Sequence, residues 1–226
     1  AKFILKLAKL DDFNGNPATL RGQAVEKAIL SSVFYKHKSI EELIEEARGY
    51  FSSELLGLSQ KQDDKKIQSE RNALAEYISV GIPPYRRIED EPIDTQGKIK
   101  VELEGVKLPI YGYYDIQFEN HIRDLKTTRT IPFGIPYATQ RQLALYAYAT
   151  KKEVWVDYVS RKKYSSKKIT DLSKTIAEIT HICQGIEKFM AITDDIHELA
   201  SMHHPNLDSW EWGEDDINNW KKLGVS

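Results

Sequence analysis

The chain has 226 residues, of which 41% are hydrophobic and 10% aromatic, so it is long enough for one large domain or for a domain with a helical annex. Its 32 Lys and Arg and 34 Asp and Glu give a formal net charge of −2, which means that any nucleic-acid-binding surface must be local. The single cysteine, Cys183, excludes a disulfide framework, a zinc ribbon and a four-cysteine iron–sulfur cluster.

The first part of the chain, residues 1–82, is predicted to be mainly helical. Helices are predicted over residues 18–35, 39–56 and 63–80. Gly22 lies in the first of them and permits another element to approach closely. Ser39 and Glu42 form a capping box that begins the second helix, and the third is expected to end at Gly81, before two prolines.

The period of the apolar residues changes from near 3.6 to 2 at about residue 83, which predicts a sheet core over residues 83–169. Strands are predicted over residues 85–93, 98–103, 153–158 and 163–169, and as a hairpin over residues 106–126. Residues 94–97 are expected to break the first two strands. The helix predicted over residues 138–150 joins the hairpin to the next strand, as a crossover between parallel strands does.

Helices are predicted in the last part of the chain, residues 170–226, over residues 170–192, 194–202 and 214–222. Ile182 and Ile186 belong to an apolar stripe that we expect to be buried, and Trp210 and Trp212 are expected to pack within this segment. No linker is visible, so residues 1–226 are predicted to form a single α/β (α+β) domain with a central mixed β-sheet flanked by helices.

The hairpin carries paired acidic residues. A two-residue turn ending at Asn120 places Asp115 directly opposite Asp124, and alternation along the strands puts Lys126 on the same face. The opposite face is then formed by Ile116, Phe118 and Leu125. Two carboxylates about 5 Å apart repel each other, so we expect a compensating divalent cation such as Mg²⁺, which takes oxygen ligands. An ordinary solvated hairpin face is the alternative.

The helix over residues 138–150 carries Gln142 and Tyr146, which lie on one face because they are four residues apart. Taken alone, this pair is best explained as a core tyrosine and a surface glutamine. Its position directly after the Asp115, Asp124 and Lys126 group gives it a second interpretation as part of the same site.

These motifs resemble those of the PD-(D/E)XK nuclease superfamily, and within it the RecB-like exonucleases of phage and bacterial recombination. The matching segments are Arg21-Gly22-Gln23-Ala24-Val25-Glu26, Gly112-Tyr113-Tyr114-Asp115, Asp124-Leu125-Lys126 and Gln142-Leu143-Ala144-Leu145-Tyr146. Glu26 stands where many members have His. The resemblance covers about residues 20–158 and implies a restriction-endonuclease-like core.

The resemblance also implies the roles of the site residues. One or two Mg²⁺ or Mn²⁺ ions would be held by Glu26, Asp115, Asp124 and the backbone carbonyl of Leu125. Lys126 would orient or activate the attacking water, while Gln142 and Tyr146 would position the DNA strand or the acidic side chains.

The function implied is that of a Mg²⁺-dependent deoxyribonuclease, an exonuclease that processes duplex DNA ends in recombination or repair. The alternatives are a structure-specific endonuclease on the same core and a non-catalytic DNA-binding or scaffold protein. A single-strand annealing or recombination partner and a homo-oligomer are compatible with this class. No apolar run approaches the ~20 residues of a membrane span and no signal peptide is visible, so we expect no membrane partner and a cytoplasmic location in a bacterial or phage-infected cell.

Basic residues after the hairpin and in a later turn are candidates for binding DNA phosphates. They are Arg129, Arg161, Lys162 and Lys163. Such residues bind the backbone without reading bases, so the binding would be salt-sensitive and tolerant of sequence. A solvated turn rich in lysine is an equally simple explanation of the same residues.

Overall fold

The structure is a computed structural model that describes residues 2–9, 15–58, 63–209 and 212–224. The chain divides into two compact units, each of which is described by itself. The larger unit comprises residues 14–104 and 108–179, and the smaller comprises residues 1–13, 105–107 and 180–226. That the whole chain acts as one domain stays a prediction.

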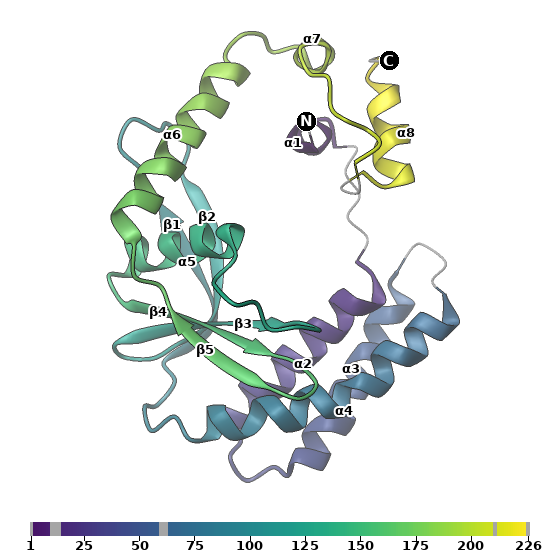
Figure 1. Cartoon of the computed structure of the whole chain (residues 1–226), viewed down its shortest axis with the longest axis vertical. Helices are drawn as coiled ribbons and strands as arrows, with labels where there is room; N and C mark the ends of the chain where they lie inside the picture. Colours follow the sequence, from purple (N-terminus) through teal and green to yellow (C-terminus); the bar gives the residue numbers. More distant parts are fainter. Residues whose placement is uncertain (1, 10–14, 59–62, 210–211, 225–226) are drawn as a thin grey trace. The chain divides into compact units, whose positions relative to one another are not determined.

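A five-stranded mixed sheet forms the centre of the larger unit (Figure 1). Its strands are β1 (Asp94–Val101), β2 (Ile110–Gln117), β3 (His121–Thr127), β4 (Glu153–Val159) and β5 (Tyr164–Lys168), which lie side by side in this order. Only β3 and β4 run parallel, and helix α5 (Tyr137–Thr150) connects them. The predicted crossover and the predicted fold class, a mixed sheet flanked by helices, are therefore confirmed.

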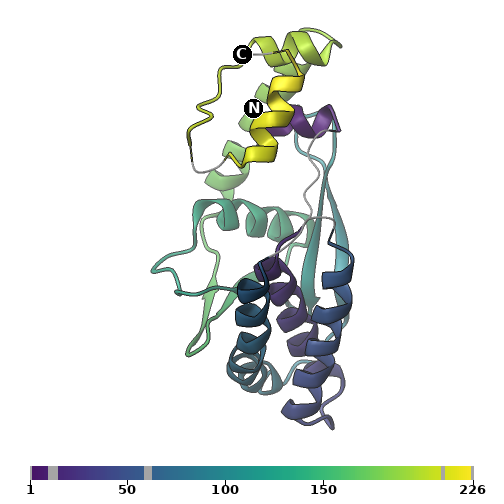
Figure 2. The ribbon, with the colours of Figure 1, turned by 90° about the vertical axis from the view of Figure 1, so that its right-hand side faces the viewer.

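Three helices cover one face of the sheet, and Figure 2 shows them side by side. They are α2 (Pro17–Phe34), α3 (Ile40–Leu56) and α4 (Asp64–Arg86). The predicted capping box of α3 is present: Ser39 Oγ accepts a hydrogen bond from Glu42 N, and Ser39 N donates one to the Glu42 carboxylate. Ile116, Phe118 and Leu125 of the hairpin are buried in the core beneath these helices, as predicted.

Gly22 lets α2 approach β3. A Cβ atom added at Gly22 would lie 3.2 Å from Thr127 Oγ1, so a larger residue would push the helix and strand apart. The predicted role of this glycine is therefore confirmed. The close approach brings the next turn of α2, with Glu26, alongside the strand that carries Asp124.

The predicted strand over residues 85–93 is wrong, because α4 continues to Arg86. Pro83 and Pro84 lie in its last turn, where they remove two backbone donors. Ile82 and Tyr85 are fully buried in the core on either side of these prolines. Their burial offsets the missing hydrogen bonds, and the helix ends only at its C-cap, Arg87.

The predicted break at residues 94–97 is also wrong, because these residues begin β1. Thr95 pairs with Ile116 and Gly97 with Tyr114, which leaves Gln96 and Asp115 opposite each other but unpaired. Gln96 has a φ of +54°, which is uncommon for a residue other than glycine. Gly97 leaves room for the Tyr114 ring, since a Cβ there would lie 2.1 Å from Tyr114 Cζ.

Helix α6 (Leu172–Met190) spans residues of both units. Its predicted buried stripe is wrong in part: Ile179 is buried, whereas Ile182 and Ile186 are 38% and 39% exposed. The larger unit ends at Ile179, so its core covers only the first half of the helix.

The smaller unit has its own apolar cluster. It contains α1 (Lys2–Leu7), which the sequence did not predict, and α7 (Ile196–Ser201) and α8 (Glu214–Lys222), which it did. Trp212 packs edge-on against Trp220 with ring centroids 5.7 Å apart, while Trp210 lies outside the described residues. None of the helices in the described part of the chain is long and apolar enough to cross a membrane.

An ion pair between Arg123 of β3 and Asp157 of β4 ties the middle of the sheet together. Arg123 Nη1 lies 2.9 Å from Asp157 Oδ2, and the Asp157 side chain is completely buried. Tyr164 of β5 also donates to Asp157 at 2.8 Å. The Arg123 side chain is only 15% exposed, so it depends on this carboxylate for compensation.

Replacing Asp157 by Ala should lower the free energy of unfolding by about 3–5 kcal/mol, because it leaves Arg123 largely buried without its partner. Urea unfolding followed by circular dichroism measures the change. Lys100→Ala is the matched control, since Lys100 and Glu102 form an exposed pair that contributes less than about 1 kcal/mol. Equal stability of the Asp157→Ala variant and the control would contradict the role given to this pair.

Candidate active site

Strands β2 and β3 part at the two aspartates. The predicted two-residue turn is present, with Phe118 N donating to His121 O at 2.8 Å, and Ile116 pairs with Arg123. This register places Asp115 opposite Asp124, but the regular pairing ends before them. The backbone N–H of Leu125 donates instead to Asp115 Oδ2 at 2.5 Å. The carboxylate has taken the place of the next backbone acceptor of the ladder.

Asp124 is held from two sides. Lys126 Nζ lies 2.8 Å from Asp124 Oδ2, and Gln142 Nε2 of α5 donates to Asp124 Oδ1 at 3.4 Å. Gln142 also donates to Tyr146 OH at 2.6 Å. The predicted pair on α5 therefore faces the acidic residues of the hairpin.

Tyr146 crosses from α5 to β2, where its hydroxyl donates to the carbonyl of Tyr113 at 2.5 Å. Gly112 makes room for the ring, because a Cβ atom there would lie 3.1 Å from Tyr146 Cε1. Gly112 thus lies against α5, whereas Ile116 lies in the core beneath α2, α3 and α4. The alternation of side chains between the two faces of β2 is therefore broken near Asp115, the residue opposite Gln96.

Glu26 reaches the same region from α2. Its carboxylate accepts a hydrogen bond from Gln96 Nε2 and lies close enough to Lys126 and Asp124 for their charges to affect its pKa. Sequence reasoning missed Gln96, since a glutamine within a predicted turn carries no signal of its own. The structure brings Glu26, Asp115, Asp124, Lys126, Gln142 and Tyr146 to one region.

Burial raises the pKa of the carboxyl groups of Glu26, Asp115 and Asp124. The pKa of Asp115 is raised well above its usual value by burial and then by the charges of Asp124 and Glu26. Burial also raises the pKa of Asp124 and of Glu26, although Lys126 opposes the rise in both. Burial alone would lower the pKa of Lys126, but Asp124 and the other carboxylates raise it overall, so Lys126 stays an ammonium ion at neutral pH.

The donor atoms fit a hard divalent cation held by one or two carboxylates. Asp115 and Asp124 provide such oxygens, and they are buried with too little positive charge to keep their pKa values at the usual level. No group of three or more His, Cys, Asp or Glu residues within the described ranges is gathered closely enough to hold a metal ion. Ligation by Glu26 and by the Leu125 carbonyl therefore stays a prediction.

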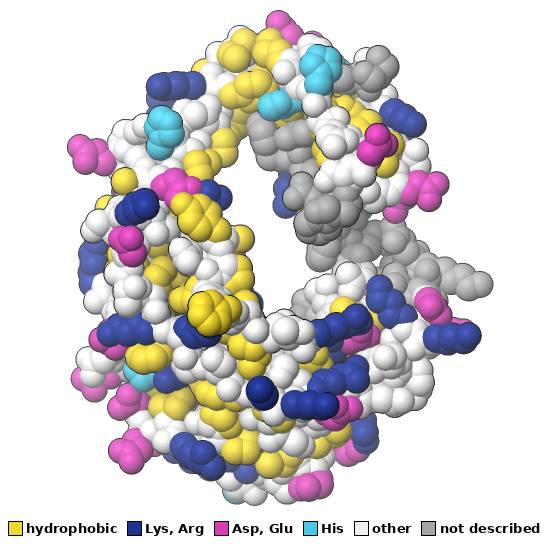
Figure 3. Space-filling view, viewed as in Figure 1, with side chains coloured by type: hydrophobic (Ala, Val, Ile, Leu, Met, Phe, Trp, Pro, Cys, Tyr) yellow, Lys and Arg dark blue, Asp and Glu magenta, His cyan; other side chains and the backbone are white. Residues whose placement is uncertain are grey.

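Four basic residues line one cavity of about 760 Å³, which we name the basic cavity. It is lined by Ser69, Tyr77, Arg129, Thr130, Ile131, Ser160, Arg161, Lys162 and Lys163. The structure thus brings together all four basic residues that the sequence singled out. Figure 3 shows Lys and Arg side chains gathered on this side of the larger unit, around the ends of β3 and of the β4–β5 hairpin.

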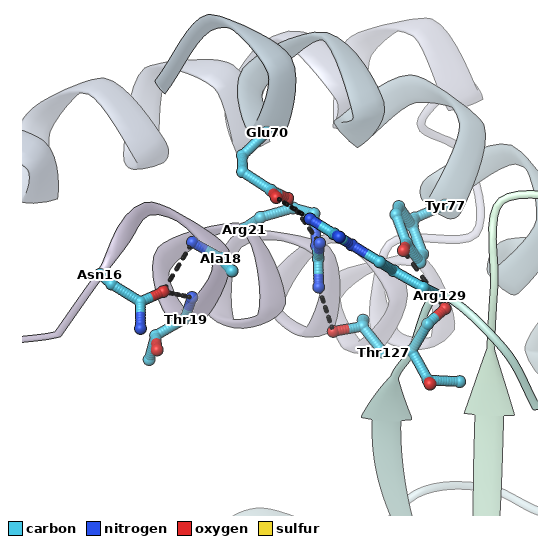
Figure 4. A network of polar contacts seen from close by, with 9 residues as sticks. Asn16, Ala18, Thr19, Arg21, Glu70, Tyr77, Thr127 and Arg129 are labelled. Carbon is cyan, nitrogen blue, oxygen red and sulfur yellow. Dashed lines mark hydrogen bonds and ion pairs between the residues drawn. The ribbon is translucent and has the colours of Figure 1, made fainter. Parts of the chain in front are cut away.

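A buried ion pair supports the edge of the basic cavity (Figure 4). Arg21 Nη1 of α2 lies 2.5 Å from Glu70 Oε2 of α4, and its other terminal nitrogen donates to Thr127 Oγ1 of β3 at 3.3 Å. Arg129 lies 3.4 Å from the second oxygen of Glu70, with its side chain 81% exposed. Glu70 thus contacts both arginines, and nothing in the sequence predicted these contacts.

Comparison with known proteins adds little to this description. No protein-family model matches the sequence, and no curated protein matches it as a relative. A crystal structure of a protein from Eubacterium rectale, provisionally named an exonuclease, matches 80% of this chain and 75% of its own, with 13% identity and a TM-score of 0.44. The crystal structure of SSO0001 matches 81% of this chain and 86% of its own, with 16% identity and a TM-score of 0.36. Neither similarity is close enough to assign a function.

Asp115→Asn should stabilise the metal-free fold at neutral pH. A carboxyl whose pKa is raised by folding contributes stability below its unfolded pKa, and that contribution is lost as the pH rises through the folded pKa. The Asn side chain keeps an acceptor for Leu125 N–H without the charge. Because the ionised form of this buried carboxyl group destabilises the fold, we expect the variant to have a higher Tm than the wild-type protein at neutral pH.

Thermal unfolding in EDTA between pH 5 and 8 measures this effect. The stability difference between the variant and the wild-type protein should grow as the pH rises. Glu119→Gln, in the exposed turn of the same hairpin, is the control and should change little. A variant that is less stable than the wild-type protein at pH 7.5 would show that Asp115 is not under electrostatic strain.

Proposed function

We propose that the protein is a divalent-metal-dependent deoxyribonuclease that hydrolyses phosphodiester bonds at the ends of duplex DNA. The observation that carries this proposal is the meeting of Asp115, Asp124 and Lys126 where β2 and β3 part. Glu26 and the Gln142–Tyr146 pair reach the same place from α2 and α5. Buried acids with raised pKa values cluster at functional sites, which supports a catalytic role for this group.

The carboxylates of Asp115 and Asp124 would hold the cation, with Glu26 and the Leu125 carbonyl as further ligands. When bound, Mg²⁺ or Mn²⁺ would polarise the scissile phosphate and make a water molecule more acidic. Lys126 Nζ lies 2.8 Å from Asp124 Oδ2, so the lysine would have to give up this contact if the cation were bound through that oxygen. Asp124 would then rely on the cation, instead of Lys126, to compensate its charge.

Lys126 acts as a cation rather than as a base. Its raised pKa keeps it protonated at neutral pH, so it donates hydrogen bonds. Once released from Asp124, its ammonium group can orient the attacking water or stabilise the negative charge that develops on the phosphate oxygens. Gln142 remains bonded to Tyr146 and holds Asp124 in place from α5.

The basic cavity supports DNA as the substrate. Thr127 and Thr128 separate Lys126 from Arg129 along the chain, so the cavity begins close to the acidic residues. Its arginines and lysines would neutralise strand phosphates without reading bases. The sequence shows no base-reading module, which favours degradation from ends over cleavage at a specific sequence.

Asp124→Asn and Lys126→Ala should each reduce DNA hydrolysis by at least about 100-fold while leaving the fold intact. Asp124→Asn removes a carboxylate that would hold the cation, and Lys126→Ala removes positive charge placed at the reacting phosphate. The assay follows linear and covalently closed duplex DNA with Mg²⁺ or with EDTA. Glu119→Gln serves as the control because it removes an exposed acid from the far end of the same hairpin.

The outcomes separate the alternatives. Degradation of linear DNA alone supports the exonuclease, nicking of closed circles supports a structure-specific endonuclease, and binding without cleavage supports a scaffold protein. If Asp124→Asn cuts DNA at the wild-type rate, the proposed site is wrong.

Replacing Arg161, Lys162 and Lys163 together by Ala should weaken DNA binding and flatten its salt dependence. Each lost phosphate contact lowers the slope of log K against log[salt] by about 0.9. Fluorescence anisotropy in EDTA at several salt concentrations measures this slope. Lys100→Ala is the control, because Lys100 is exposed on β1 and paired with Glu102. An unchanged slope for the triple variant would exclude the basic cavity from DNA binding.

A further inference from the structure

A second cavity, of about 610 Å³, is lined by residues of α2, of α3 and of the start of β1, and Glu26 is one of them. We name it the aromatic cavity. Its principal lining residues are Gln23, Glu26, Phe34, Tyr35, Tyr50 and Gln96. The nuclease function proposed above uses only Glu26 of these residues, so the rest of the cavity is unexplained.

The walls of the aromatic cavity offer flat apolar surfaces. Phe34 and Tyr35, at the end of α2, are 47% and 50% exposed although they are large aromatic residues. Tyr50 of α3 forms a further wall and carries the ammonium group of Lys27 at 4.3 Å from its ring centroid. Exposed aromatic rings of this kind are the surfaces on which nucleobases stack, and such stacking tolerates any base.

The polar groups of the cavity suit a neutral heterocycle. Gln23 and Gln96 each present an amide, which both donates and accepts hydrogen bonds, as the edge of a base does. Glu26 is the only acidic residue of the lining, and Lys27 is the only basic one. Flat aromatic walls with amides at the edge fit a nucleobase better than they fit a phosphate group.

Gln96 connects the aromatic cavity to the acidic residues. Its side chain donates to Glu26, and its backbone lies opposite Asp115 in the register of β1 and β2. Its φ of +54° is a strained conformation, which persists only where the surrounding structure holds it. A ligand in the cavity would therefore lie next to the position where the scissile phosphate is expected.

We propose that the aromatic cavity binds a nucleobase of the nucleotide next to the scissile phosphate. This inference rests on the nuclease function proposed above and names a part of its substrate site. A base must leave the helical stack to enter the cavity, and this costs least at an unpaired or frayed end. The cavity therefore favours DNA ends over the interior of a duplex.

The test removes the base and the aromatic walls separately and together. We use a series of DNA duplexes, each with a single abasic nucleotide at a different position near the end. The affinity of the Asp124→Asn variant for each duplex is measured. One abasic position should weaken binding by about 5- to 150-fold, the factor expected for one lost stacking contact. When Phe34→Ala and Tyr35→Ala are added, an abasic nucleotide at the same position should not weaken DNA binding further. With Tyr35→Trp, the abasic nucleotide should still weaken binding, because an aromatic ring remains in the cavity.

Tyr111→Ala is the matched control, since Tyr111 is 53% exposed on β2 and lies outside the cavity lining. It should show the same abasic penalty as the parent protein. A penalty that persists in the Phe34→Ala/Tyr35→Ala variant, or no penalty at any position, would overturn the proposal. If the protein neither binds nor cuts any DNA, the nuclease function itself is wrong. If it cuts DNA but shows no abasic effect, only the base-binding role of the cavity is wrong.

A titration with deoxyadenosine monophosphate distinguishes the two sources of a base. Binding of the free nucleotide that is lost in Phe34→Ala/Tyr35→Ala, without an abasic effect in duplex DNA, would assign the cavity to the released product and overturn a strand-bound base. An abasic effect without binding of the free nucleotide supports the proposal that the cavity binds a base of the DNA strand.

Discussion

Asp115 and Asp124 are both buried on neighbouring strands, and the site depends on how their charges are compensated. Lys126 lies 2.8 Å from Asp124, and one backbone N–H serves Asp115. These contacts are not enough, because the pKa values of both carboxyl groups remain raised. Buried acids with raised pKa values of this kind cluster at functional sites. A divalent cation is the compensation that their oxygens fit.

The rest of the larger unit places groups around these two residues. The parting of β2 and β3 frees the carboxylates from the ladder, and Gly22 lets α2 carry Glu26 to β3. Helix α5 covers the other face and holds Asp124 through Gln142. The two cavities then extend the site in different directions, one basic and one aromatic. Together they would bind the backbone and a base of one strand.

Local rules account for what the sequence predicted well. The turn after Phe118 fixed the hairpin register, and a spacing of four residues placed Gln142 and Tyr146 on one face of α5. Tertiary packing decided the rest. Helix α4 passes through two prolines because residues around them are buried, and the left-handed φ of Gln96 has no local cause in its sequence. The contact of Glu70 with Arg129 joins residues 59 positions apart, which no local pattern reveals.

The most direct measurement is the position of a bound ion. Crystals grown with Mn²⁺ should give an anomalous peak about 2.0–2.3 Å from carboxylate oxygens of both Asp115 and Asp124, with Lys126 Nζ moved away from Asp124. This result would show that the cation replaces the lysine as the compensating charge. A saturating Mn²⁺ concentration that leaves no peak between the two aspartates, with the Lys126–Asp124 contact intact, would contradict the account.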